Sequence, residues 1–362
     1  MKHRILLLSS YFLVLTSLFT SCKVDFSPNA SWKNIPAVYC VVDPEEDTVW
    51  ARVQRVWLSE DNLYQYATVY DSINYTPGQI SVHLLAWEGI RGSGNTFSRG
   101  SRVLHRWQFA DTVRDGKPDG LFAGGMQPLF YCVPDIPLVR DTACVLQLVV
   151  LDNASGDTLA QAFTDLLGMR PKVRMGNDSV ERVLVSPSLA RGNEFGYRVG
   201  CRGKISWNTI PRGRRYQPIV TLFYEKHGDT LGIQIPGMAI TDASQSSVLN
   251  TTSITQDRLL SYVKNALADN RDTLYNVNNV DITIAVCNED LNAYLGTQEG
   301  LAASSQGQQV YTNIQGGMGI FGSRRSHIVA NVPCDSVGKT GYLPYELKNL
   351  HVGFYGDFGG KR

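Results

Sequence analysis

Alternation of apolar and polar residues dominates the chain and predicts a mainly β protein. Short runs rich in β-branched and aromatic residues lie between Gly, Pro, Asp and Asn residues, which is the pattern of strands joined by turns. Such alternation is expected of a sheet that has one face in water. The number and spacing of these runs predict a β-sandwich, whose first two strands flank an acidic turn as a hairpin. In the first half of the chain the predicted strands are 35–43, 48–58, 80–89, 102–113, 128–133, 143–153 and 158–167.

The strand pattern lapses at 166–179, where Pro and Gly appear, and this predicts a domain boundary. We therefore expect two β-sandwich domains, an N-terminal one at 33–170 and a C-terminal one at 171–362. The segment KISWNTIPRGRRYQPIVTLFYE at 204–225 resembles fibronectin type III sandwiches, in which a strand Trp and a following Tyr pack across the core. The resemblance implies immunoglobulin- or fibronectin-like domains. Strands of the second domain are predicted at 180–186, 194–207, 217–237 and 280–290.

Two short α-helices are predicted within the second domain. The first, 253–270, begins with Ser253 and Gln256 in the spacing of a capping box. Its apolar residues recur at helical spacing and predict one buried face. The second helix, 288–299, begins with Asn288 as its cap and has acids in its first turn, where the helix dipole favours them. Both apolar faces are expected to contact the core.

The first twenty-two residues have the pattern of an export signal. Lys2 and Arg4 precede the largely apolar run 5–19, and small residues then lead to Cys22. The cysteine resembles the acylated residue of a bacterial lipobox, although Phe19 stands where Leu, Val or Ile is more usual. We predict a signal peptide at 1–21, lipidation of Cys22 and a tether at 22–32; two acyl chains suffice for stable anchoring. The alternative is an ordinary signal peptide that is cleaved nearby.

Charge and cysteine content narrow the function classes. The chain has 34 Lys and Arg against 33 Asp and Glu, so its net charge argues against nucleic acid as a partner. Export permits disulfides. The cysteines are irregularly spaced and have no pair of His residues nearby, which argues against a zinc site. We expect no metal or cofactor. The cysteines either pair in an unassigned pattern or are buried as small apolar residues, and those after Cys22 are Cys40, Cys132, Cys144, Cys201, Cys287 and Cys334.

A G-x-G-x-x-G string at 317–322 raises the alternative of a dinucleotide site. That fingerprint requires a following helix and a βαβ unit, whereas the residues after Gly322 are typical of loop and strand. We therefore interpret the glycines as structural, allowing positive φ and close backbone approach. Met318, Ile320 and Phe321 are then expected to fill the core. The predicted structural glycines are Gly316, Gly317, Gly319 and Gly322.

The segment VYTNIQGGMGIFGSR at 310–324 resembles the C-terminal signature of a family of uncharacterised Bacteroidota lipoproteins. The first hairpin, the segment VYDSINY at 69–75 and the segment NEDLNAYL at 288–295 are also similar to that family. Cys40 stands where members often have Gly. The resemblance implies a lipoprotein of the outer membrane, on its periplasmic or cell-surface face, with a role in envelope assembly or uptake beside an outer-membrane receptor. It supplies no catalytic residues.

Basic residues are concentrated between Lys172 and Arg215, with few acids to oppose them. One interpretation is a solvated polar face. The other is a surface that binds lipid A phosphates, an acidic glycan or an acidic protein, because arginine suits such groups. Arg324 and Arg325 would add to it, whereas Glu45, Glu46 and Asp47 are expected to be solvated. The predicted anion-binding residues are Arg198, Arg202, Lys204, Arg212, Arg214 and Arg215.

No local motif indicates catalysis. The histidines have no metal-ligand spacing, and no nucleophile elbow is present. We expect a non-catalytic, membrane-anchored binding or assembly component of an envelope complex. The first rival is a surface adhesin or glycan-binding protein, which exposed Trp or Tyr would favour. The second is a hydrolase, which would need a pocket with convergent titratable groups.

Overall fold

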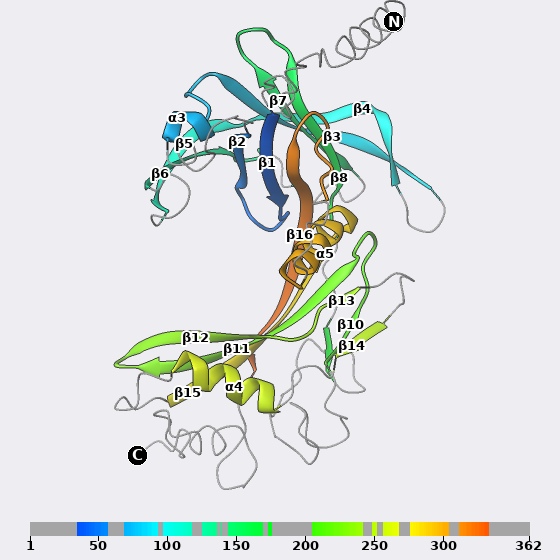
Figure 1. Cartoon of the computed structure of the whole chain (residues 1–362). Helices are drawn as coiled ribbons and strands as arrows, with labels where there is room; N and C mark the ends of the chain where they lie inside the picture. The colour runs from blue at the N-terminus through cyan, green and yellow to red at the C-terminus, as the bar shows by residue number, and fades with distance from the viewer. Residues whose placement is uncertain are drawn as a thin grey trace, which may run out of the picture.

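A computed structural model of the chain shows a mainly β protein (Figure 1). Several earlier predictions lie outside the described residues: the signal peptide with Cys22 and the tether, the strand 180–186, most of the strand 194–207, and the Ser253 cap. The structure describes residues 35–56, 69–92, 97–117, 125–135, 138, 144–168, 173–175, 205–241, 248–251, 256–267, 276–303 and 311–332.

A nine-stranded sheet runs through the molecule in the order β12-β11-β15-β16-β1-β2-β6-β5, with β13 also paired to β11. The predicted first hairpin is confirmed, because β1 and β2 pair antiparallel. The strands of this sheet are β1 (Ile35–Val42), β2 (Val49–Val56), β5 (Ala110–Lys117), β6 (Gly125–Cys132), β11 (Arg215–Lys226), β12 (Asp229–Pro236), β13 (Ile240–Thr241), β15 (Asn276–Cys287) and β16 (Met318–Val332).

Strand β16 joins the two halves of this sheet. Its first residues pair parallel with β1, from Ala37 opposite Met318 to Val42 opposite Ser323. Its later residues pair antiparallel with β15, from Cys287 opposite Arg324 onward. Figure 1 shows β16 passing from the upper to the lower part of the molecule. Strand β16 thus comes from the C-terminal part of the sequence but pairs with β1, the first of the described strands. The division into domains 33–170 and 171–362 stays a prediction.

A second sheet has the order β4-β3-β7-β8 and shares a buried core with the first. Its strands are β3 (Ile80–Arg91), β4 (Phe97–Gln108), β7 (Val145–Asp152) and β8 (Thr158–Asp165). Val38 and Val53 of the large sheet lie in one buried cluster with Leu84 and Leu148 of the second sheet. Successive side chains of a strand point to opposite faces, so the apolar residues at every second position all face this core.

The prediction of one strand at 102–113 is wrong. The structure divides the segment into β4, which pairs with β3, and β5, which pairs with β6 of the other sheet. The change of sheet falls at Phe109, whose ring is buried and whose N–H donates to Val82 O at 2.9 Å. A continuous apolar–polar period does not reveal such a corner, because both strands keep one face inward.

A second core fills the lower half. Helix α4 (Gln256–Ala266) lies beside β12, and its Leu259 and Val263 join a buried cluster with residues of β11, β12 and β15, which confirms its predicted apolar face. Trp207 and Tyr216 are fully buried there, with ring centroids 6.2 Å apart. Beside this core lies a small sheet of β9 (Val173–Met175), β10 (Ile205–Asn208) and β14 (Val248–Thr251).

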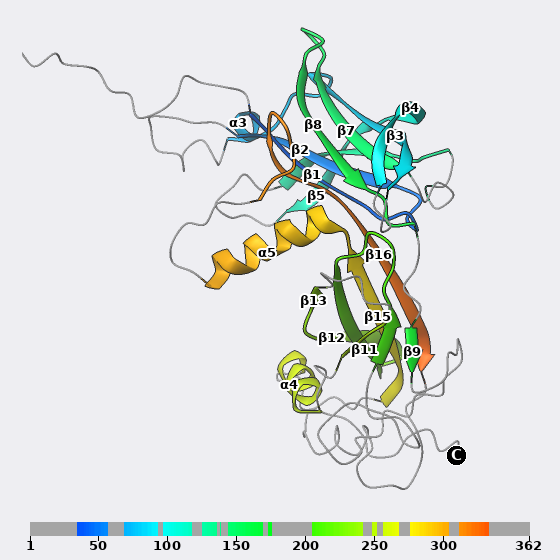
Figure 2. The same cartoon turned by 90° about the vertical axis from the view of Figure 1, so that its right-hand side faces the viewer.

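Helix α5 (Glu289–Ala303) lies against β16 (Figure 2). Its predicted cap is confirmed, because Asn288 Oδ1 accepts the N–H of Leu291 at 3.2 Å. The helix extends four residues beyond the predicted end at residue 299. A one-turn helix, α3 (Tyr70–Ile73), was not predicted. None of the helices in the described part of the chain has the length and apolar character needed to cross a membrane.

Candidate functional site

The glycine segment lets β16 approach its neighbours. Gly316 and Gly319 have φ of 79° and 108°, a region that favours glycine. A Cβ on Gly319 would lie 2.0 Å from Val38 O, and one on Gly317 would lie 2.5 Å from Pro36 O. A Cβ on Gly322 would lie 3.0 Å from the Cβ of Leu291 in α5. The string lies on a strand, so no helix N-terminus follows it.

Side chains of this segment divide between core and surface. Ile320 and Phe321 are buried, as expected from the sequence. The expectation for Met318 is wrong, because its side chain is 40% exposed. The reason is register: Met318 and Ile320 lie on the outer face of the large sheet, and α5 covers only Ile320 through Leu291.

Asn313 ties the segment to β8. Its Nδ2 donates to Phe321 O at 2.7 Å and to Phe163 O at 3.2 Å, and its Oδ1 accepts the Phe321 N–H at 3.0 Å. The side chain therefore serves as a bridge between two strands that do not pair there. Backbone groups within a protein need such partners, since leaving them unpaired is costly. The residues of the signature-like segment thus make internal contacts.

Asp290 lies at the centre of a polar cluster that adjoins Asn313. Its Oδ2 accepts from Thr164 Oγ1 at 2.9 Å and its Oδ1 accepts from Tyr311 OH at 2.9 Å. Asn288 donates to Thr164 Oγ1 at 2.6 Å and accepts the Ser323 N–H at 3.3 Å. Burial raises the pKa of Asp290, and these hydrogen bonds partly oppose the shift. Both carboxylate oxygens are engaged, so the cluster is built to hold α5, β8 and β16 together.

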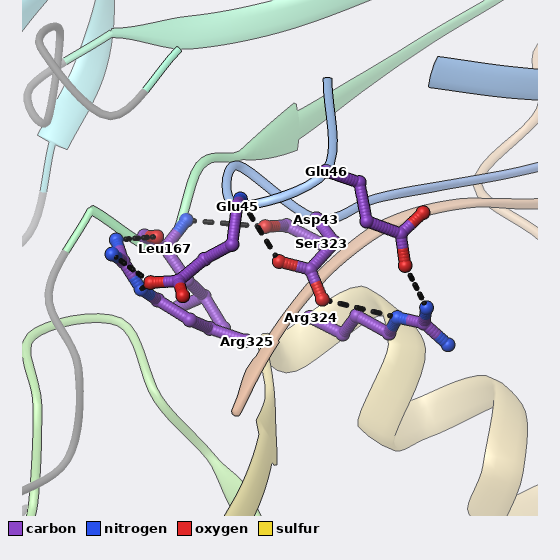
Figure 3. A network of polar contacts seen from close by, with 7 residues as sticks. All are labelled: Asp43, Glu45, Glu46, Leu167, Ser323, Arg324 and Arg325. Carbon is purple, nitrogen blue, oxygen red and sulfur yellow. Dashed lines mark hydrogen bonds and ion pairs between the residues drawn. The ribbon is translucent and has the colours of Figure 1, made fainter. Parts of the chain in front are cut away.

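The acidic turn after β1 meets two arginines of β16 (Figure 3). Glu45 Oε1 accepts from Arg325 Nε at 3.0 Å and Nη2 at 2.5 Å. Arg325 also donates through Nη1 to Gly168 O at 2.6 Å and to Leu167 O at 3.3 Å. Glu46 pairs with Arg324 at 2.6 Å. Glu45, Glu46 and Asp47 are exposed, as the sequence predicted. The parallel pairing of β16 adds what the sequence did not show, an arginine partner beside each of the two glutamates.

Asp43 completes this contact. Its Oδ1 accepts the Glu45 N–H at 3.1 Å, and its Oδ2 lies 3.4 Å from Arg324 Nε. Burial raises the pKa of Asp43, while the Glu45 N–H and the charge of Arg324 act in the opposite direction. Ser323 Oγ accepts the N–H of Leu167 at 3.1 Å. The turn, the end of β8 and β16 are thereby joined into one polar junction.

The structure places three of the predicted anion-binding arginines in contacts within the chain. Arg212 is buried and donates through Nη1 to Cys144 O at 2.9 Å and to Leu166 O at 3.2 Å. Arg214 Nε lies 2.5 Å from Glu289 Oε2, and Arg215 pairs with Glu299 of α5. Arg212 therefore connects the segment before β11 to the ends of β7 and β8, and Arg214 and Arg215 connect the same region to α5. Arg198, Arg202 and Lys204 lie outside the described residues.

The cysteines of the described strands are buried free thiols: Cys40, Cys132, Cys144 and Cys287. Cys132 ends β6 in the large sheet, and Cys144 precedes β7 in the four-stranded sheet, so the two do not lie on paired strands. Burial raises the pKa of Cys132 to about 12 and that of Cys287 to about 11. Cys201 and Cys334 lie outside the described residues. Among the residues that are described, no group of His, Cys, Asp and Glu could hold a metal ion.

The outer face of the four-stranded sheet contains functional groups that the sequence analysis missed. Trp87 Nε1 donates to Gln147 Oε1 at 2.8 Å, Gln147 Nε2 donates to Gln161 Oε1 at 3.0 Å, and Gln161 Nε2 donates to Gln315 Oε1 at 3.2 Å. This amide row crosses β3, β7, β8 and the segment before β16. The sequence could have indicated this row, because Gln147 and Gln161 stand at polar, outward-facing positions of predicted strands.

An arginine lies over the aromatic end of the amide row. The guanidinium carbon of Arg99 is 4.7 Å from the ring centroid of Trp87 and 4.9 Å from that of Phe163. We call Arg99, Trp87, Phe163 and the three glutamines the Arg99 face. A comparable stack on the large sheet places Arg114 4.4 Å from the centroid of Trp50, beside Tyr131.

Comparison with known proteins identifies no family. No family model and no curated protein matches the chain. Among solved structures, a DUF4785 family protein from Legionella pneumophila is similar over 66% of this chain, with 13% sequence identity and a TM-score of 0.19. The match spans 49% of that protein's chain. A likeness at this TM-score supports no conclusion on fold or function.

Proposed function

We propose that the protein is a non-catalytic lipoprotein, anchored to the outer membrane through Cys22, that acts as a binding or assembly component of an envelope complex. The observation that carries this proposal is the cysteine at the end of an export signal. Two acyl chains on that residue would give stable anchoring. The proposal places the chain with the Bacteroidota lipoproteins that its C-terminal segment resembles.

The Asp290 cluster and the polar junction support a binding role over catalysis. The half-buried carboxylate of Asp290 is engaged at both oxygens, and Glu45 of the junction is engaged by Arg325. A general acid or base needs an oxygen that is available to a substrate. We also propose that the two sheets of the first half form an immunoglobulin-like sandwich, which their shared core supports.

The test is affinity purification of the tagged protein from detergent-solubilised membranes of its host. A Cys22→Ser variant is the matched control, because it keeps the export signal and removes the acylated thiol. We expect the native protein to sediment with membranes and to retain a fixed envelope partner, whereas the variant is released. Membrane association that does not depend on Cys22 would overturn the anchoring. A native protein that is retained without any partner would overturn the assembly role.

The second candidate function is recognition of glycans at the cell surface. The observation that favours it is the Arg99 face, where Trp87 and Phe163 lie beside a row of amides. Aromatic rings and planar amides on a rigid sheet suit a ligand that has both apolar and hydroxyl surfaces.

A further inference from the structure

The Arg99 face is fixed by the sheet beneath it. Gln147 lies opposite Phe163 across the pairing of β7 and β8, and Leu85 of β3 lies opposite Gln147 on its other side. The amide of Gln147 is nearly buried, so its orientation is set by Trp87 and Gln161. None of the described helices lies over this sheet in Figure 1 or Figure 2. A site on strands is better preorganised than a site on loops.

Arg99 differs from the described arginines that form ion pairs within the chain. Arg214, Arg215, Arg324 and Arg325 each pair with a carboxylate of the chain. Arg99 is exposed, and within the described residues no carboxylate pairs with it. Two aromatic rings hold its guanidinium instead, and such contacts stabilise a cation without neutralising it. The side chain is therefore held in position with its charge available to an outside anion.

The amide row adds a second kind of contact. Gln147 and Gln161 each use one N–H and one oxygen lone pair for their neighbours, and Gln315 uses one lone pair. An amide has two of each. Gln161 and Gln315 are the accessible members, so they retain donors and acceptors that can reach a ligand. Neighbouring hydroxyl groups of a sugar match such a row, because a hydroxyl both donates and accepts.

We propose that the Arg99 face binds an acidic saccharide. Arg99 contacts a carboxylate of the ligand through two parallel N–H bonds, and Gln161 and Gln315 contact its hydroxyl groups. An acidic peptide fits less well, since extended peptides bind sheets mainly through backbone hydrogen bonds at an edge, and this face offers side chains. The inference rests on the proposed location outside the cytoplasm, where such polymers would be met.

The test measures binding of the purified, full mature chain to three uronate or sulfated polymers: polygalacturonate, hyaluronate and heparin. The matched neutral probe is fully methyl-esterified polygalacturonate, which has the same backbone without the charge. We expect at least one acidic polymer to bind, the binding to weaken as salt is added, and the methyl ester not to bind. Absence of binding to all three acidic polymers would overturn the proposal.

Two variants localise the site. Arg99→Gln removes the charge, and we expect binding to fall by about tenfold or more, as for loss of a charge-assisted contact. Arg102→Gln is the matched control on the same strand, because Arg102 pairs with Glu88 and is 68% exposed. We expect its affinity to stay within about twofold of wild type.

A third variant keeps the test informative if Arg99→Gln folds poorly. Gln315→Ala changes an exposed end of the amide row, and we expect a several-fold loss of affinity with an unchanged melting temperature. Equal binding by Arg99→Gln and wild type would overturn the proposal, and so would Arg99-dependent binding of a poly-glutamate peptide with higher affinity. Acylation of Cys22 and partner retention are measured separately, so failure here leaves the proposed anchoring and assembly role standing.

Discussion

Glu45 and Arg325 form an ion pair across 280 residues of sequence, with Oε1 2.5 Å from Nη2. The Arg325 side chain is only 6% exposed, and the Glu45 side chain is 27% exposed. Their contact fixes the first hairpin against β16, the strand that joins both halves of the large sheet. The adjacent pair, Glu46 with Arg324, lies in solvent, with side chains 51% and 54% exposed. The Glu45 pair is more buried and has two hydrogen bonds where the Glu46 pair has one, so the exposed pair serves as the control for the buried one.

We expect Glu45→Gln to lower the free energy of unfolding by about 2 kcal/mol, because it leaves a nearly buried guanidinium without its carboxylate. Glu46→Gln should cost less than about 1 kcal/mol, since exposed ion pairs contribute little. Equilibrium urea unfolding of both variants measures the difference. Equal losses would contradict the burial argument.

Gly319→Ala should be among the most damaging single substitutions. The backbone has a φ of 108°, and the new Cβ would lie 2.0 Å from Val38 O, so β16 must move away from β1. We expect a loss of about 4 kcal/mol or more, or failure to fold. Gly296→Ala is the control: it lies within α5 with no atom near its Cβ position, and should stabilise by up to about 1 kcal/mol. Thermal unfolding monitored by circular dichroism decides between these expectations.

Asn313→Ala should remove the bridge between β8 and β16. The substitution leaves the N–H and O of Phe321 and the O of Phe163 without their side-chain partner, at a cost of about 2–3 kcal/mol. Thr312→Ala, at the exposed neighbouring residue, should cost less than about 1 kcal/mol. Chemical unfolding gives both values. Equal, small losses of unfolding free energy in the two variants would contradict a stabilising role for the Asn313 bridge.

The pH dependence of stability should report Asp290. Burial raises its pKa in the folded state above the ordinary value of 3.8, so the folded protein binds more protons than the unfolded chain. Stability from this group is therefore fully present below the unfolded pKa and is lost as pH rises through the folded pKa. We expect Asp290→Asn to flatten that part of the stability profile. An unchanged slope between pH 4 and 7, measured by urea unfolding at about five pH values, would contradict the assignment.

Thiol alkylation should report the burial of the described cysteines. Burial raises the pKa of Cys40, Cys132 and Cys287, and the thiolate is the reactive form. We expect iodoacetamide at pH 8 to leave these three unmodified in the folded protein and to modify them in guanidinium, as mass spectrometry of the peptides would show. Rapid modification of Cys132 in the native protein would show that its strand opens readily.

Local patterns predicted the elements that depend on neighbours in sequence. The first hairpin, the apolar face of α4 and the Asn288 cap follow from periodicity and capping chemistry. The contact of Glu45 with Arg325 could not be predicted, because it requires the parallel pairing of β16 with β1. The corner at Phe109 was also missed, since an unbroken apolar period does not indicate which sheet a strand joins.

The Arg99 face illustrates the same limit for function. Arg99, Gln147, Gln161 and Gln315 come from segments as much as 216 positions apart, and nothing in any one segment marks them as neighbours. Conversely, the basic stretch that drew attention in the sequence includes Arg214 and Arg215, whose partners are on α5. Counting charge along the chain did not reveal the partners of Arg214 and Arg215, because those acids follow much later in the sequence.

The mass of the mature N-terminal peptide, isolated from host membranes, tests the central claim most directly. A chain anchored as we propose begins at Cys22, and its first peptide has the added mass of a diacylglyceryl group. A peptide that begins at another residue, or an unmodified Cys22, would contradict the account of a lipid-anchored envelope protein.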